Sequence, residues 1–339
     1  MEKGNYYSEK SRRNAQLAHQ TANDCPAVVQ RLYNSLVNGM AASTVMTYMY
    51  DIKEFFFWYG KRIGLPEDAP LTRITDDDIA KIDHVVLEDY FGALVASGLK
   101  ENRRARVYSA LNSLFSYIDK DNNPLRGIKR AKIAKRAPIV RLVDDEPSRL
   151  LGVVRDGYEG QSKHESDLRK DYKSRDEAIL TLLLTIGIRV SECAGLNICD
   201  VDFNRHTLAI TRKGGFKQEI ALGESAEGAL QNYLIKREQI IPADAEDDKA
   251  LFLTRQKKRM QESSICAIVK KYAAALGLNR KITPHKLRKT YGTNLYNATG
   301  DILLVANALG HTNINTTAHH YIESDAADLQ RVKDITPLS

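Results

Sequence analysis

The sequence is poor in cysteine and has no long apolar run. Four cysteines occur among 339 residues, none in a CxxC pair or at the Cys/His spacing of a zinc site. Cys25, Cys193, Cys199 and Cys266 therefore predict reduced thiols rather than a disulfide framework or a metal site. No apolar run approaches the ~18 residues of a membrane span, and the first residues, MEKGNYYSEKSRRN, lack the apolar core of a signal peptide. These absences predict a cytoplasmic protein without a membrane segment.

Positive charge is what the sequence has in excess. Lys and Arg number 50 and Asp and Glu 43, so the formal net charge of +7 suggests a polyanionic partner such as a nucleic acid. An excess of the same size lies in residues 120–141, where eight basic residues accompany one acid, Asp121. A basic run is often only solvated, but this one separates two candidate domains. We therefore expect a linker at 123–141 that contacts the phosphate backbone, which gives affinity and salt dependence rather than sequence choice. The candidate contacts there are Lys129, Arg130, Lys132, Lys135 and Arg136.

The length and periodicity predict two domains, the first of them all-helical. Residues 1–25 are polar and without periodicity, and predict a flexible arm. Residues 26–122 keep helical spacing, as in Val28, Leu32 and Leu36. Near the end of this domain Arg103, Arg104 and Arg106 are predicted to lie on the outer face of a helix. They indicate either a solvated face or further phosphate contacts.

The second domain, 142–339, is predicted to mix helices with a small β-sheet. Residues 156–174 are polar and predict an insertion between two helices. The strand-like runs TLAIT and QEIAL flank KGGFK, a glycine-rich turn, and so predict a β-hairpin with Lys213 at its tip. The fold class expected is therefore mainly α with a small β-hairpin: an all-helical domain followed by a mixed α+β domain.

Two charged residues stand in the most apolar part of this domain. The run AILTLLLTIGIRVSECAGL predicts a buried helix, a break at Gly187 and a short second helix. Arg189 and Glu192 are the charges that follow the break, and a guanidinium there needs an anion. Either the two residues only pair with each other, or Glu192 orients Arg189 toward a phosphate.

The C-terminal part collects groups suited to phosphate chemistry. Thr283 and Pro284 predict a helix start, and His285 and Arg288, three residues apart, share one face of that helix. A second apolar run ends at a glycine that precedes His311, and Tyr321 follows ten residues later. Two imidazoles, a guanidinium and a phenol suit an anionic, phosphate-like centre attacked by a tyrosine oxygen.

These motifs resemble the C-terminal signature of the tyrosine recombinases, the integrase family. The resemblance is carried by HKLR (285–288), LGH (309–311) and the following Tyr321. It extends to GIRVSECAGL, similar to the family's first arginine motif, and to TRKGG, similar to the lysine hairpin of Xer-type members. In the first domain, STVMTYMYDIKEFF and NRRARVYSALNSLFSYI resemble the family's core-binding domain. One departure is that the usual nine-residue spacing after the LGH histidine falls on His320, so Tyr321 is one residue late.

The resemblance implies a role for each candidate residue. It makes Tyr321 the nucleophile, which forms a 3′-phosphotyrosine. It implies that Arg189 and Arg288 bind the non-bridging oxygens of the phosphate, with Glu192 in support. His285 and His311 would donate hydrogen bonds and accept the phenol proton, because imidazoles titrate near neutrality. Lys213, with Lys217 as the alternative, would protonate the leaving 5′-oxygen, and no metal or cofactor is expected.

The resemblance also implies the partners of the chain. They are double-stranded DNA with a specific inverted-repeat site and further copies of the same chain, as a dimer on one site and a tetramer in the synaptic complex. Strand exchange would pass through a Holliday junction, and the tail after Tyr321 would dock on a neighbouring protomer. Two alternatives stay open: a DNA-relaxing enzyme like the type IB topoisomerases, and a non-catalytic DNA-binding protein, for which the displaced tyrosine is the argument.

Overall fold

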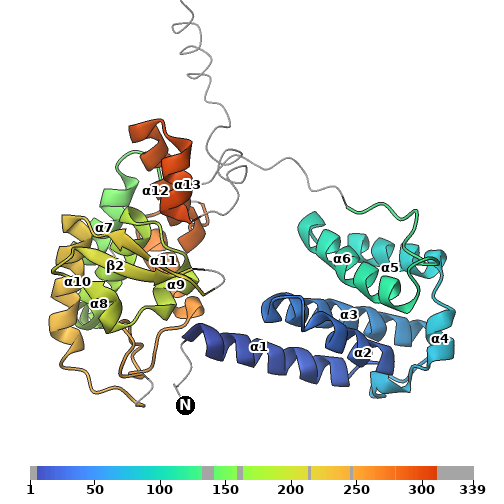
Figure 1. Ribbon diagram of the computed structural model, residues 1–339. Coiled ribbons are helices and arrows are strands. Elements are labelled where there is room, and N and C mark those ends of the chain that lie inside the picture. Colours follow the sequence, from blue (N-terminus) through green and yellow to red (C-terminus); the bar gives the residue numbers. More distant parts are fainter. Residues whose placement is uncertain are drawn as a thin grey trace, which may run out of the picture. The chain divides into compact units, whose positions relative to one another are not determined.

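The computed structural model describes residues 6–131, 141–158, 163–212, 215–244, 247–278 and 280–310 (Figure 1). The chain divides into two compact units, residues 1–137 and 138–339. Each unit has its own hydrophobic core. In the described parts of the chain, no helix is both long and apolar enough to cross a membrane.

Unit 1 is helical and is built around α3 (Ala42–Arg62). Phe55 on this helix is fully buried, and its ring centroid lies between 5.0 and 6.1 Å from those of Tyr59, Tyr90 and Phe115. The other elements are α1 (Tyr6–Asn23), α2 (Ala27–Leu36), the 3₁₀ turn η1 (Leu71–Arg73), α4 (Asp76–Ala80), α5 (His84–Ala96) and α6 (Glu101–Ile118). The predicted all-helical first domain is therefore confirmed.

The predicted flexible arm at the N-terminus is wrong for Tyr6–Asn23. These residues form α1, which packs along α3 and adds Ala18 and Ala22, both fully buried, to the core. Small residues four apart let two helices approach closely without an apolar stripe, so the hydrophobic pattern gave no signal. The helix leads to Cys25, whose thiol is also fully buried.

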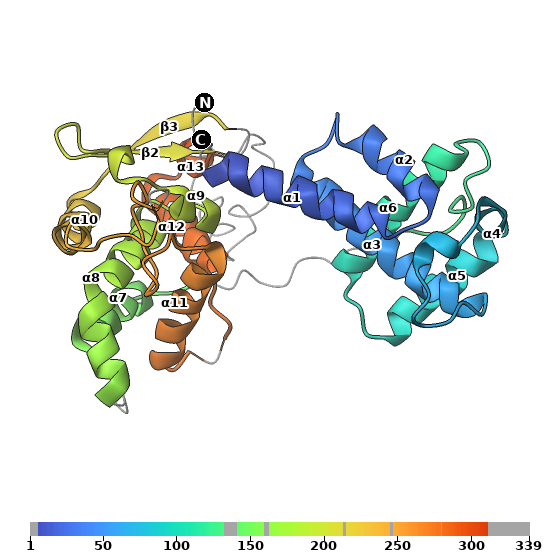
Figure 2. The same cartoon turned by 90° about the horizontal axis from the view of Figure 1, so that it is seen from below.

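Unit 2 joins helices to a three-stranded antiparallel sheet in the order β1-β2-β3. Its elements are α7 (Glu146–Asp156), α8 (Lys163–Thr185), α9 (Val190–Gly195), the 3₁₀ turn η2 (Ile198–Asp200), β1 (Val201–Asp202), β2 (Thr207–Thr211), β3 (Lys217–Ala221), α10 (Glu224–Arg237), α11 (Glu262–Ala275), α12 (Pro284–Thr299) and α13 (Ile302–Leu309). In β2, Leu208 and Ile210 alternate into the core, and Leu208 lies opposite Ile220 of β3. The predicted hairpin and the mixed α+β class are confirmed, and Figure 2 shows the hairpin close to α9 and α13.

The polar stretch 156–174 is not an insertion over most of its length. From Lys163 onward it belongs to α8, which continues without interruption into the buried run that ends at Thr185. In its first turns Asp167 and Lys170 are exposed, with Lys170 Nζ 3.4 Å from the Asp167 carboxylate. A helix that begins in solvent carries no apolar period there, which is why the sequence pattern predicted a loop.

Candidate active site

The start of α9 fixes an arginine and a carboxylate against each other. The peptide N–H of Arg189 donates to Glu192 Oε2 at 2.7 Å, and its Nη1 donates to Glu192 Oε1 at 2.8 Å. Glu192 is 2% exposed, whereas 34% of the Arg189 side chain is exposed. Gly187, which precedes the pair, has φ +66°, and a Cβ there would lie 2.3 Å from Tyr291 Cδ1. The chain thus turns sharply under a tyrosine ring, and Arg189 is left at the edge of the core.

Two further guanidiniums face the same carboxylate. Arg212 Nη1 lies 3.0 Å and Arg288 Nη1 3.8 Å from Glu192 Oε2, and both side chains are almost fully buried. Three positive charges against one negative charge leave an excess of two among the described residues. An excess of positive charge that is mostly buried, with Arg189 partly exposed, favours binding of an anion from outside.

The same three arginines hold the last carbonyls of α13. Arg212 Nη2 donates to Ala308 O at 3.0 Å, Arg288 Nη2 to Leu309 O, and Arg189 Nη2 to Gly310 O at 3.3 Å. The last carbonyls of a helix have no partner within it and carry the negative end of its dipole. The C-terminus of α13 is therefore fixed at the arginine cluster, directly before His311 in the chain.

The carboxylate of Glu192 is held in its charged form. Burial alone would raise its pKa, but the peptide N–H of Arg189 and the charges of Arg212 and Arg189 outweigh burial and lower the pKa below its usual range. The arginine cluster thus keeps a permanent carboxylate at its centre. Its geometry suits the oxygens of a phosphoryl group, because planar guanidiniums bind such oxygens through paired N–H donors.

Arg212 was not predicted from the sequence. It follows β2 and continues the alternation of Leu208 and Ile210, which places it on the inner face of the sheet. A positive charge at an inward position of a strand was the signal that could have identified it.

The other predicted catalytic residues differ in what the structure describes of them. His285 lies in the first turn of α12, exposed, one turn before the buried Arg288. Lys213, His311 and Tyr321 lie outside the described residues. Lys217, the alternative lysine, is at the start of β3 and its Nζ lies 3.3 Å from the buried carboxylate of Asp200.

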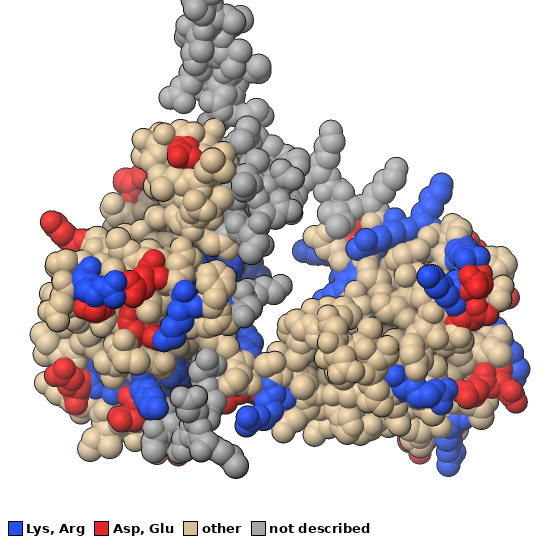
Figure 3. All heavy atoms as spheres, in the orientation of Figure 1, with Lys and Arg blue, Asp and Glu red and all other residues tan. Residues whose placement is uncertain are grey.

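The basic residues predicted to contact DNA are partly described. Arg103, Lys129 and Arg130 are exposed, and Arg104 is mostly covered. Figure 3 shows Lys and Arg side chains along the edge of unit 1 that carries α6. Lys132, Lys135 and Arg136 lie outside the described residues.

Arg106 has a structural partner that the sequence pattern did not reveal. Its Nε and Nη2 donate to the two oxygens of Asp51 at 2.7 and 2.9 Å, and Asp51 is 2% exposed. The guanidinium is thus held in a bidentate pair that joins α6 to α3. Two of its nitrogens are therefore already bound within unit 1.

A groove beside Arg106 is lined with hydroxyl groups. It has a volume of about 510 Å³ and lies between the first turns of α3 and the first half of α6. Its polar lining consists of Ser43, Thr44, Thr47, Tyr48, Asn102, Arg106, Ser109 and Arg130. Hydroxyl and arginine donors of this kind are typical of surfaces that contact a phosphate backbone.

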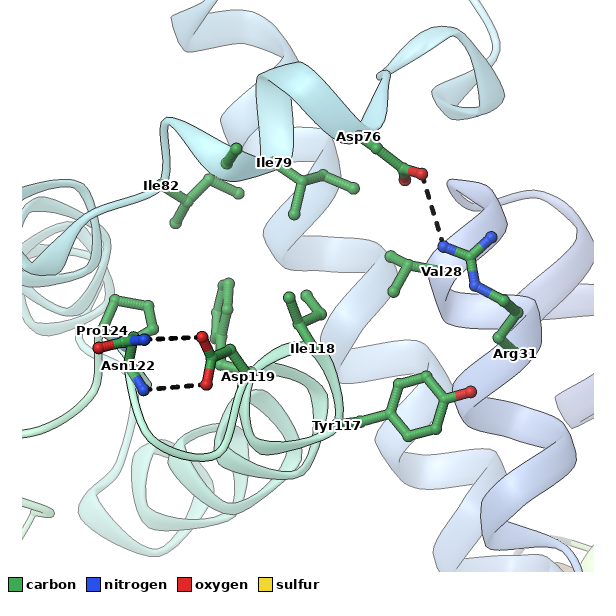
Figure 4. Close-up of a pocket in the computed structure, with 12 residues that line it drawn as sticks. Val28, Arg31, Asp76, Ile79, Ile82, Tyr117, Ile118, Asp119, Asn122 and Pro124 are labelled. Carbon is green, nitrogen blue, oxygen red and sulfur yellow. Dashed lines mark hydrogen bonds and ion pairs between the residues drawn. The ribbon is translucent and has the colours of Figure 1, made fainter.

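A second pocket in unit 1 carries no comparable chemistry (Figure 4). It measures about 580 Å³ and lies between α2, α4 and the end of α6. Its Arg31 is paired with Asp76 at 3.6 Å. Its Asp119 accepts hydrogen bonds from the peptide N–H groups of Asp121 and Asn122. Both charges are satisfied locally, so the arginine cluster of unit 2 is the better candidate site.

Comparisons with known proteins identify the family to which the chain is similar. Residues 162–328 match the phage integrase family. The chain is 31% identical over 314 residues to the tyrosine recombinase XerS of Streptococcus pyogenes serotype M6, covering 81% of this chain and 85% of XerS.

Solved structures show the same fold. The XerH site-specific recombinase bound to a palindromic difH substrate superposes with a TM-score of 0.66 at 20% identity, over 95% of this chain and 94% of XerH. The lambda integrase, solved as a tetramer bound to a Holliday junction, gives a TM-score of 0.61 at 17% identity, over 90% of this chain and 80% of the integrase.

Proposed function

The chain belongs to the phage integrase family and is a tyrosine site-specific recombinase, and we propose that it cuts and rejoins DNA through a 3′-phosphotyrosine formed by Tyr321. The observation that carries the proposal is the cluster of Arg189, Arg212 and Arg288 around Glu192. A partly exposed excess of positive charge at the edge of a core is suited to one phosphodiester. It lies where the motifs that contain Arg189 and Arg288 meet.

The chemistry of a phosphodiester explains what such a cluster contributes. In-line attack by an oxygen builds charge on the non-bridging oxygens, so cations fixed in advance lower the barrier most. Arg189 is the partly exposed member of the cluster and would contact the phosphate directly, with Arg288 behind it. Glu192 holds Arg189 in place, because it accepts from both its backbone and its side chain.

The proton transfers fall to residues next to the cluster. His285 shares a helix face with Arg288, and His311 directly follows the carbonyls that the arginines hold. We propose that both histidines donate hydrogen bonds to the phosphate and that they accept the proton of the phenol. Lys213, which directly follows Arg212, is assigned to the leaving 5′-oxygen. Retaining the bond energy in the phosphotyrosine lets the strands be rejoined without ATP.

The partner is double-stranded DNA with a specific site. In support, unit 1 presents the hydroxyl-lined groove with Arg130, and the linker adds the basic residues that follow it. We propose a dimer on one site and a tetramer in the synaptic complex, as in the lambda integrase structure, which is a tetramer on a Holliday junction. We also propose a cytoplasmic location, where a DNA substrate would be found.

The decisive test is a covalent adduct on a nicked suicide substrate. The wild-type chain should give a gel-shifted adduct, and Tyr321→Phe, which removes only the phenol oxygen, should give none while still binding the duplex. Tyr296→Phe on α12 is the matched control and should form the adduct at the wild-type rate. An adduct that persists in Tyr321→Phe, or that mass spectrometry maps to another residue, would contradict the assignment. Strand exchange between two duplexes, without relaxation of a single supercoiled circle, distinguishes the recombinase from a type IB-like relaxing enzyme.

A further inference from the structure

We propose that Arg212 is a positioning residue of this recombinase, which ties the end of β2 to Glu192 and to the C-terminus of α13 without touching DNA. The inference rests on the proposed function, because it concerns how the phosphate-binding arginines are oriented. Arg212 lies within TRKGG, where the resemblance gives the catalytic role to Lys213. The role of Arg212 is inferred from its own contacts.

The contacts of Arg212 come from three different elements. Its Nε donates to Gln218 Oε1 on β3 at 2.9 Å, its Nη1 to Glu192 on α9 at 3.0 Å, and its Nη2 to Ala308 O on α13 at 3.0 Å. The side chain is 2% exposed. All three nitrogens are therefore directed at protein acceptors inside unit 2. This guanidinium acts as a brace between elements.

Glu192 shows what the brace controls. One carboxylate oxygen accepts from the Arg189 side chain, while the other accepts from the Arg189 peptide N–H and from Arg212. Arg288 Nη1 is 3.8 Å from this second oxygen. Without Arg212, the second oxygen would turn toward Arg288, and Arg189 and Arg288 would both change their direction relative to the phosphate.

The end of α13 shows a second constraint from the same side chain. Gly310 has φ +60°, and a Cβ there would lie 2.7 Å from Arg212 Nε and 2.8 Å from its Cζ. Glycine at this position therefore satisfies the left-handed backbone and also makes room for the guanidinium. Arg212 and Gly310 directly precede Lys213 and His311 in the chain. One buried side chain thus fixes the residues that come directly before two proposed catalytic residues.

The test compares Arg212→Met and Arg212→Lys with Arg205→Met in the full chain. Arg205 is a matched control on the same sheet, where it forms an exposed bidentate pair with Glu219. We expect duplex affinity within about twofold of wild type for all three. Arg212→Met should slow adduct formation at saturating substrate by about 10²-fold, the effect of a misplacement near 1 Å. Arg212→Lys should recover most of the thermal stability that Arg212→Met loses, because it keeps the positive charge beside Glu192. Its cleavage should stay slow, because one ammonium cannot reach three acceptors.

A double-mutant cycle separates positioning from general stability. If Arg212 acts through the orientation of Arg189, then Arg212→Met adds little to the cleavage defect of Arg189→Ala, whereas a purely structural role would give additive losses. Gly310→Ala alone should slow cleavage, because its Cβ would displace the guanidinium of Arg212. Combined with Arg212→Met, which lacks that guanidinium, it should slow cleavage much less.

The outcomes are distinguishable from failure of the proposed function. Absence of any adduct from wild-type protein would overturn the function and this inference together. Normal cleavage by Arg212→Met, full recovery by Arg212→Lys, or additive losses in the Arg189 cycle would each overturn the positioning role while leaving the recombinase assignment intact.

Discussion

Two buried carboxylates, Asp51 in unit 1 and Glu192 in unit 2, are each 2% exposed, but they differ in how many of the described arginines face them. Asp51 has one, Arg106, which binds it in a bidentate pair. Glu192 has three, from the turn before α9, the end of β2 and the helix α12. In the matched pair one positive and one negative charge neutralise each other, and the pair joins two helices. Among the described residues, the cluster around Glu192 has more arginines than carboxylates, a composition that suits an anionic substrate.

The strongest way to break this contrast is to remove a guanidinium from the unmatched cluster. Arg189→Ala and Arg288→Ala should each slow adduct formation on a nicked duplex by about 10²- to 10³-fold, the usual loss for one oxyanion donor. Duplex affinity should stay near wild type, measured by fluorescence anisotropy. Parallel losses of binding and cleavage would instead make these arginines simple phosphate anchors.

Removing the guanidinium from the matched pair should affect stability rather than chemistry. Arg106→Ala removes both hydrogen bonds to the buried Asp51, which should destabilise unit 1 by about 2 kcal/mol, because Arg106 itself is partly exposed. Urea unfolding followed by Trp58, the only tryptophan in the chain and a residue of α3, measures this directly. Arg31→Ala is the control, because its pair with Asp76 is exposed and should contribute less than about 1 kcal/mol. A loss of similar size in both variants would remove the distinction between them.

The acid sensitivity of unit 2 should sharpen the same contrast. Because the pKa of Glu192 is lowered in the folded state, its contribution to stability is present above the pKa of an unfolded glutamate and is lost as the pH falls through the folded value. Glu192→Gln should be less stable than wild type at neutral pH, and the difference should shrink on acidification. The midpoints of urea unfolding, followed by circular dichroism at several pH values between neutral and acidic, test this. Curves that stay parallel would mean that Glu192 does not titrate as inferred.

The smallest effect is expected from the linker. Replacing Lys129, Arg130, Lys132 and Lys135 by Gln should reduce the salt dependence of duplex binding, by at most about 0.9 in the log–log slope for each phosphate that the linker no longer neutralises. Cleavage at saturating DNA should be unchanged. An unaltered slope would mean that these residues remain in solvent when DNA is bound.

Local sequence patterns predicted those parts of the site that are local. Glu192 was found because it follows Arg189 by three residues, and His285 and Arg288 because they share a helix face. Arg212 and the Asp51–Arg106 pair were missed, since their partners lie 20 and 55 residues away and only the tertiary fold brings them together. The same reason applies to α1, whose small residues meet α3 through shape rather than through an apolar stripe.

The two buried thiols allow the opening of each unit to be timed in the intact chain. Burial raises the pKa of Cys25 to about 12, and burial also raises that of Cys193, which follows Glu192 in α9. Thiols of this kind are inert to alkylation until the surrounding structure opens. With the exposed Cys199 and Cys266 replaced by Ser, the labelling rate of Cys25 reports unit 1 and that of Cys193 reports the helix beneath the arginine cluster. A duplex that fills the cluster should slow the labelling of Cys193 and thereby measure, without any cleavage, how much substrate binding rigidifies the catalytic unit.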